Sequence, residues 1–164
     1  HWRDWSSDVC SSDLRKRLVF LGDITAPELS ERYLGLCDAA RAADLIEPTQ
    51  MNVHLASDIM AEEIANHIDQ IGQQVDGIAA GSDLIAMHAV RALADRGMTF
   101  PGQISVTGFD DLPLAEQTIP RLTTISQNIA SGARAMVHAL FERMAGNESQ
   151  SVEMTPELIR RDTA

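Results

Sequence analysis

Through most of the chain after Arg15, short apolar runs alternate with longer stretches in which apolar residues recur at helical spacing. The runs that are typical of buried strands lie at 17–22, 50–56, 76–80 and 103–109. The helical patterns between them cover 27–43, 58–71 and 83–96. Strands joined by short helical connections form a parallel sheet with helices on both faces. The sequence therefore predicts an α/β fold with a doubly wound parallel sheet.

The last part of the chain departs from this alternation. We expect an extended segment at 122–126, a helix over 129–144 and a final extended segment at 151–161. The helix carries one apolar stripe, formed by Ile129, Ala133, Met136, Leu140 and Met144.

Local signals predict where two of the helices begin. Thr25 and Glu28 have the spacing of a capping box, with Pro27 in the first turn. Ser82 or Asp83 opens the helix over 83–96.

Composition and charge exclude several functions. The formal net charge is −11, from 13 basic and 24 acidic residues, so this part of the protein should repel the phosphates of nucleic acid. The two cysteines, Cys10 and Cys37, have neither metal nor disulfide spacing, which fits a reducing cytoplasm. No apolar run approaches the length of a membrane span, and none resembles the core of a signal peptide. We expect a cytoplasmic protein with no metal, no cofactor and no membrane partner.

The first 14 residues, HWRDWSSDVCSSDL, have neither helical nor strand periodicity. The segment DWSSDVCSSDL can be back-translated into a DNA sequence that resembles a common sequencing adapter. We therefore expect residues 1–14 to be non-native, with a native sequence that begins near Arg15 and is truncated upstream. The alternative is a disordered native tail. Removing their one basic and three acidic residues changes the net charge from −11 to −9, so the chain stays acidic.

Short polar side chains follow the ends of the predicted strands. In open parallel sheets, ligands bind beyond the carboxyl ends of the strands. Those ends lead here to the loop before Arg32 and to three polar corners, Ala56-Ser57-Asp58, Gly81-Ser82-Asp83 and Phe109-Asp110-Asp111. Sugar hydroxyls need such convergent donors and acceptors, and carboxylate and guanidinium groups form the strongest of these bonds.

Several short motifs follow one another in a fixed order along the chain. They are S-D-L-I-A at 82–86, R-G-x-x-x-P at 96–101, G-F-D-D at 108–111 and P-R-L-T-T-I-x-Q at 120–127. E-R-Y-L-G at 31–35 and E-L-I-R-R at 157–161 belong to the same set. Any one motif is weak, but the ordered set is specific and covers essentially Arg15 to the end. Together these motifs resemble the LacI/GalR (lactose-repressor/galactose-repressor) family of transcription regulators.

The resemblance implies a fold like that of type I periplasmic sugar-binding proteins, with two α/β lobes around an effector cleft. Residues 15–164 would supply mostly the carboxy-terminal lobe, and 129–161 would partly return to the amino-terminal lobe. Family members read operator DNA through an amino-terminal helix–turn–helix, which would lie outside this sequence. The implied function is effector sensing and dimerisation in a DNA-binding regulator, with a sugar as the expected small-molecule effector.

The resemblance also assigns effector-binding residues. Arg32 matches the arginine of an R-x-x-G motif that reaches the effector, and Asp110 matches the aspartate of G-F-D-D that accepts hydrogen bonds from it. Ser82 occupies a position that contacts ligand in some members, although it also suits a helix N-cap. Gln127 falls where the chain crosses between lobes, near the cleft. The alternatives are a solvated surface role for Arg32 and a turn-capping role for Asp110 and Asp111; we assign the turn role to Asp111.

The predicted helix over 83–96 is apolar on nearly every side. A helix buried on two sides in a small sheet protein suggests a partner surface, and the family uses this helix in its dimer interface. The resemblance therefore implies a homodimer with the interface residues Leu84, Met87, His88 and Arg91. The alternative is burial of this helix between the sheet and its neighbouring helices.

Two other functions compete with that of a regulator. A periplasmic solute-binding protein of a transporter has a similar fold, but L-T-T-I-x-Q and E-L-I-R-R favour the regulator. An enzyme that uses Asp110 and Asp111 as a paired acid and base would need a nucleophile or metal partner, and none is near in the sequence. We therefore expect no enzymatic activity. A basic helix–turn–helix upstream would support regulation, and a signal peptide would support transport.

Overall fold

Four parallel strands form the central sheet of the computed structural model. They are β1 (Leu18–Leu21), β2 (Thr49–Met51), β3 (Gly77–Ala80) and β4 (Ser105–Thr107). Their order across the sheet is β2-β1-β3-β4, and each neighbouring pair runs parallel. The structure describes residues 15–54, 59–71, 74–149 and 151–164. The segment 1–14, expected to be foreign, and the Ala56-Ser57-Asp58 corner lie outside the described residues.

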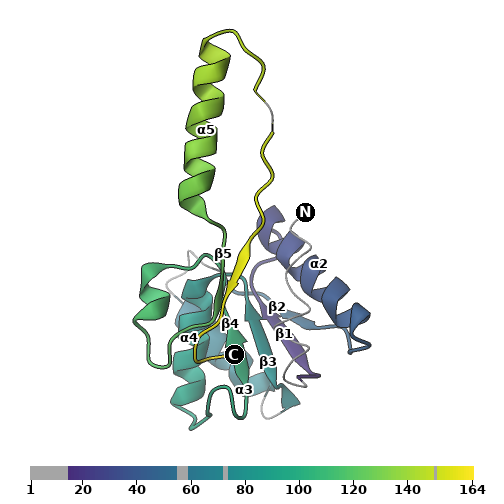
Figure 1. Cartoon of the computed structure of the whole chain (residues 1–164). Helices are drawn as coiled ribbons and strands as arrows, with labels where there is room; N and C mark the ends of the chain where they lie inside the picture. Colours follow the sequence, from purple (N-terminus) through teal and green to yellow (C-terminus); the bar gives the residue numbers. More distant parts are fainter. Residues whose placement is uncertain (1–14, 55–58, 72–73, 150) are drawn as a thin grey trace.

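Helices cover both faces of this sheet, which confirms the doubly wound arrangement (Figure 1). The helices are α2 (Pro27–Ala42), α3 (Met60–Ile71) and α4 (Asp83–Ala94). Successive side chains of a strand point to opposite faces, so β1 contributes to two cores. Phe20 packs in a cluster with Leu36 of α2, whereas Val19 belongs to the cluster that contains Ile64 of α3 and the buried side of α4.

The predicted start of α4 is confirmed. Ser82 is its N-cap, and the Ser82 Oγ accepts a hydrogen bond from the backbone N–H of Ile85 (3.4 Å). Gly97 follows the helix with a φ of +75°, a conformation that glycine adopts without steric cost.

The predicted capping box at the start of α2 is wrong. The N-cap is Ala26, which makes no side-chain cap hydrogen bond. The Thr25 Oγ1 and the Thr25 backbone N–H both donate to Asp23 Oδ1, at 2.7 and 3.0 Å. Short polar side chains readily bond to groups two residues away, and this local bond takes the hydroxyl that the capping box requires.

The chain after β4 forms a small second sheet and a projecting helix (Figure 1). The strands β5 (Thr124–Ser126) and β6 (Glu157–Ile159) pair antiparallel, and α5 (Ile129–Met144) extends away from the body of the fold. The last residues return to the main sheet, where Thr163 is buried. Its backbone O accepts from the Val106 N–H (2.9 Å), and its Oγ1 donates to the Val106 backbone O (2.7 Å). The end of the chain is thereby attached to β4.

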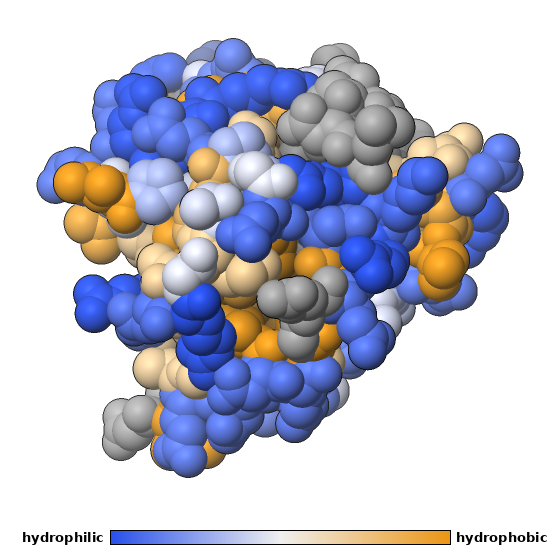
Figure 2. All heavy atoms as spheres, turned by 90° about the horizontal axis from the view of Figure 1, so that it is seen from below, coloured by the Kyte–Doolittle hydropathy of each residue, from blue (hydrophilic) through white to orange (hydrophobic). Residues whose placement is uncertain are grey.

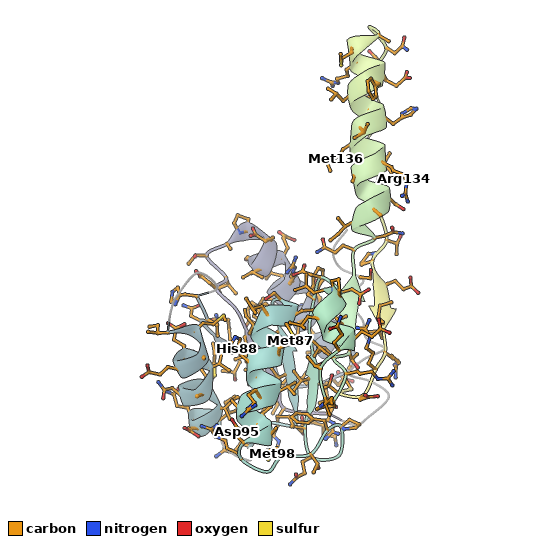
Figure 3. All side chains as sticks on the ribbon, turned by 90° about the vertical axis from the view of Figure 1, so that its left-hand side faces the viewer. Met87, His88, Asp95, Met98, Arg134 and Met136 are labelled. Carbon is orange, nitrogen blue, oxygen red and sulfur yellow. The ribbon has the colours of Figure 1, made fainter. Side chains whose placement is uncertain are left out.

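The apolar stripe predicted over 129–144 lies on α5, and no described residue covers it. No residue of α5 is buried. The large apolar side chains of the helix that are more than half exposed are Ile129, Met136, Val137, Leu140, Phe141 and Met144. In Figure 3 the side chains of α5, Met136 and Arg134 among them, project into open space around the helix. A groove of about 560 Å³ lies between α5 and segment 151–156.

Asn128 starts α5 from a left-handed backbone position, with φ 51° and ψ 52°, and its side-chain Oδ1 accepts from the Ser131 N–H (3.3 Å). Replacing Asn128 by alanine should destabilise the helix by about 1 kcal/mol, because the acceptor is lost and a β-carbon remains at positive φ. Replacing it by glycine should cost only a few tenths of that, because glycine tolerates this φ. Thermal melting followed by far-ultraviolet circular dichroism compares the two, and equal losses would contradict the capping role.

The end of the molecule opposite α5 is mostly hydrophilic, with apolar side chains gathered in separate patches (Figure 2). Within the part of the chain that the structure describes, no helix has the length and apolar character needed to cross a membrane.

Candidate functional site

The loop at 108–112, between β4 and the short helix η3 (Pro113–Glu116), forms the centre of the predicted site. Asp110 and Asp111 in this loop both have positive φ, at 114° and 52°. Such a backbone is rare for residues with a β-carbon and persists only where surrounding groups hold it. Backbone of this kind is enriched at functional sites.

Arg32 reaches this loop from α2. Its guanidinium lies over the ring of Phe109, with 3.7 Å between Cζ and the ring centroid. Its Nη1 donates to the backbone O of Gly81 at the end of β3, and its Nη2 lies 3.7 Å from Asp110 Oδ1. Burial lowers the pKa of Arg32, and the charge of Asp110 opposes this effect. Since only 12% of its side chain is exposed, Arg32 is not a solvated surface arginine.

Gln127 contacts the same carboxylate oxygen. Its Nε2 donates to Asp110 Oδ1 (2.7 Å). Burial raises the pKa of Asp110, while the charge of Arg32 and the hydrogen bond from Gln127 oppose the rise. The Asp110 side chain remains 28% exposed, so a ligand can approach it. Three of the four predicted effector-binding residues therefore come from three separate elements and meet at one carboxylate.

The fourth predicted residue, Ser82, lies next to Gly81, whose backbone O accepts from Arg32. Ser82 is buried, and its hydroxyl caps α4 as described above. The structure therefore shows its structural role, and contact of Ser82 with an effector stays a prediction.

Asp111 has an arginine partner that the sequence analysis missed. The Arg161 Nη2 donates to Asp111 Oδ1 (2.8 Å), and its Nη1 donates to the Leu122 backbone O (2.9 Å). Arg161 follows β6, and its place in the E-L-I-R-R motif was the only sequence signal for a role. Each aspartate of G-F-D-D thus lies beside its own arginine, Asp110 beside Arg32 and Asp111 beside Arg161.

This arrangement is suited to binding a small polar molecule. It offers guanidinium and carboxamide donors next to a carboxylate acceptor, which matches the needs of neighbouring hydroxyl groups on a small polar molecule. Among the described residues, no group of three or more His, Cys, Asp or Glu side chains is placed to hold a metal ion.

All four residues predicted for the dimer interface lie on α4, and Figure 3 shows Met87 and His88 on the side of this helix that faces the viewer. Leu84 is 39% exposed, Met87 and His88 are half-buried, and Arg91 is exposed. The opposite side of the helix packs on the sheet through Ile85, Ala86, Ala89, Val90 and Leu93. The alternative interpretation, burial of the helix by its neighbours, is therefore correct for the inner side of α4 alone.

A shallow pocket continues the exposed face of α4. It has a volume of about 210 Å³ and lies between Met87 and Arg91 of the helix and Ile119 of the following loop. Ile119 is 98% exposed, which is unusual for so large an apolar side chain beside other apolar groups.

Comparison with known proteins shows that residues 15–164 match the family model described as a periplasmic binding protein-like domain. A helix–turn–helix transcription regulator from the aml 5′ region of Streptomyces limosus is 34% identical over 158 residues. That match covers 82% of this chain and 44% of the regulator, and the chain spans less than half the length of the curated relatives it matches.

Two solved structures have the same fold. A periplasmic binding protein/LacI transcriptional regulator from Alkaliphilus metalliredigens QYMF, in complex with D-xylulofuranose, is 30% identical with a TM-score of 0.83, and the match covers 99% of this chain and 61% of that one. The transcriptional repressor AscG of Escherichia coli is 23% identical with a TM-score of 0.87, covering 99% of this chain and 60% of that one.

Proposed function

Because the chain belongs to the periplasmic binding protein-like family, in the form found in LacI/GalR transcription regulators, we propose that it is the effector-sensing and dimerisation part of a DNA-binding regulator. The relatives named above are transcription regulators and not enzymes. Under this proposal the chain binds its effector without chemically changing it. Effector binding shifts the balance between two conformations of the regulator and so changes its affinity for operator DNA.

One observation carries the proposal: Arg32, Gln127 and Asp110 meet at the carboxyl edge of the sheet, where open parallel sheets bind ligands. The proposed effector is a sugar, whose adjacent hydroxyl groups can donate to Asp110 and accept from Arg32 and Gln127. The Alkaliphilus relative was solved with D-xylulofuranose, which supports a carbohydrate for this chain as well.

We place residues 15–164 mostly in the carboxy-terminal lobe of a two-lobe domain, with α5 and the segment after it packing on the other lobe. The uncovered apolar side chains of α5 support this placement, since soluble proteins rarely leave so much contiguous apolar surface exposed. The groove between α5 and segment 151–156 would then accept side chains of that lobe.

Operator DNA would be bound by a helix–turn–helix outside these residues. The chain itself is acidic, so it repels phosphate. The curated relatives are named as helix–turn–helix transcription regulators. The same relatives favour a cytoplasmic regulator over the solute-binding protein of a transporter.

Thermal unfolding of the longer regulator tests the proposed function. A ligand that binds only the native state stabilises it, and Tm then rises with the logarithm of the ligand concentration once that concentration exceeds the dissociation constant. We expect at least one sugar in a panel of neutral mono- and disaccharides to do so, and Asp110→Asn to suppress the shift. If no carbohydrate shifts Tm and a ligand of another class does, the sugar assignment is wrong.

Self-association tests the dimer face of α4. Met87→Glu places a charge in the apolar patch between Leu84 and Ile119, so it should weaken the dimer by about tenfold or more. Sedimentation velocity at several concentrations gives the dissociation constant. Glu62→Ala, an exposed change on α3, is the matched control and should leave that constant unchanged. A dimer that Met87→Glu leaves intact must use another surface.

A further inference from the structure

Asp83, the first residue of α4, has a fully buried carboxylate. The Leu112 N–H donates to its Oδ2 (2.7 Å), and the Thr124 hydroxyl donates to its Oδ1. None of the ion pairs among the described residues includes Asp83. A buried carboxylate without a cation is costly, even at a helix N-terminus, and burial raises the pKa of this one. The two bonds that it accepts therefore need an explanation.

Both bonds lead to parts of the chain that carry site residues. Leu112 closes the loop that holds Asp110, and Thr124 begins β5, which leads to Gln127. The Asp110 N–H donates to the Ile125 backbone O (2.9 Å), so the loop is bonded to β5 at the first of its two positive-φ residues. The bond from the Leu112 N–H to Asp83 holds the same loop on the other side of Asp110 and Asp111.

Packing around the Asp83 carboxylate is tight. A β-carbon added at Gly108 would lie 2.2 Å from Asp83 Oδ1, so only glycine leaves room for the carboxylate. The Asp83 N–H also donates to the Phe109 backbone O (2.8 Å), which brings the start of α4 against the same loop. The loop, β5 and the helix start thus converge on one side chain.

We propose that Asp83 is a positioning residue of the effector site, which sets the loop of Asp110 and the strand before Gln127 in the relative position that lets those two side chains meet. The inference rests on the proposed function for the identity of the site. The geometry it concerns exists without effector, so it is tested without one. The positioning of the loop can therefore be confirmed or refuted even if the chain proves to bind no sugar.

Amide hydrogen exchange, measured by NMR on the whole 164-residue chain, is the test. Asp83→Ala removes both acceptors and should speed exchange of the Leu112 amide at least about tenfold more than exchange of the β1 amides. It should also lower the pKa of Asp110 toward its ordinary value, because a loosened loop exposes that carboxyl. Asp83→Asn keeps one acceptor for Leu112 and can donate to Thr124 Oγ1, so it should restore most of the protection.

Val90→Ala is the matched control, since it removes buried volume from the same helix and the valine side chain has no polar atom that could bond to the loop. It should speed exchange in the sheet and in the loop alike. A uniform effect of Asp83→Ala would overturn the inference and leave Asp83 with a structural role only. Should Asp83→Ala not fold, Thr124→Val decides the question. Loss of its bond to Asp83 should speed exchange of the Gln127 side-chain amide severalfold, and an unchanged Gln127 amide would equally overturn the inference.

Discussion

Replacing Arg32 by alanine is expected to weaken effector binding by roughly tenfold to a hundredfold or more, because a charged donor to a desolvated ligand contributes about 1.5–3 kcal/mol. The same change should lower stability by about 1–2 kcal/mol. Phe109 loses the guanidinium stacked on its ring, and the Gly81 carbonyl loses a donor. Arg32 therefore contributes to the fold as well as to the proposed site.

The neighbouring variants separate these two contributions. Asp110→Asn can still accept from Gln127, so it should weaken binding with a smaller loss of stability. Arg41→Ala is the control within α2, because Arg41 is exposed and, among the described residues, its one ion pair is with Asp38 one turn away. Calorimetric titration of effector into the regulator, with thermal unfolding alongside, measures both effects. If Arg32→Ala and Asp110→Asn both bind like the parent, the site lies elsewhere.

Gly108→Ala should be strongly destabilising for so small a change, at about 2–3 kcal/mol of unfolding free energy. The added methyl group would lie 2.2 Å from Asp83 Oδ1, 3.0 Å from Leu122 Cδ2 and 3.2 Å from Asp83 Cα. The carboxylate cannot turn aside without losing its bonds to Leu112 and Thr124. The loop must therefore move, and effector binding should weaken with it.

Gly102→Ala is the control for Gly108→Ala. Gly102 is exposed, and the nearest atom to an added β-carbon is the Thr99 Oγ1 at 3.1 Å, at the end of a side chain that can rotate. Chemical denaturation of the two variants should differ by about 2 kcal/mol in unfolding free energy. Similar midpoints and slopes would mean that the space beside Asp83 is less constrained than the packing indicates.

The sequence predicted the helices better than the strands. The helix over 129–144 has the same bounds in the structure, because Asn128 caps its start and Gly146 follows its end with positive φ. The strand expected at 103–109 is shorter, since β4 pairs with β3 at only three positions. The capping box failed because the Thr25 hydroxyl has a closer partner in Asp23. Local spacing does not reveal which of two nearby acceptors wins.

The sequence also predicted only part of the site, because contacts between residues far apart in the chain leave no local pattern. Motif resemblance selected Arg32, Asp110 and Gln127 as candidates, and the structure brings these three side chains together. Parallel-strand topology implied that residues after different strands share one edge. The pairing of Asp111 with Arg161 joins residues 50 positions apart through a strand that returns from α5, which periodicity cannot predict. The bond between Asp83 and Thr124 depends in the same way on β5 lying beside the loop, to which it is bonded through Ile125.

The most direct test of the central claim is to observe the Arg32 and Gln127 side chains while a sugar binds. We expect the Arg32 Nε and Gln127 Nε2 signals of the isotope-labelled regulator to shift saturably with a neutral mono- or disaccharide that raises its Tm. Both signals should give the same dissociation constant as calorimetry. Asp110→Asn should raise that dissociation constant by about tenfold or more. Saturable binding of the sugar that leaves both signals unmoved would contradict the claim that these residues form the effector site.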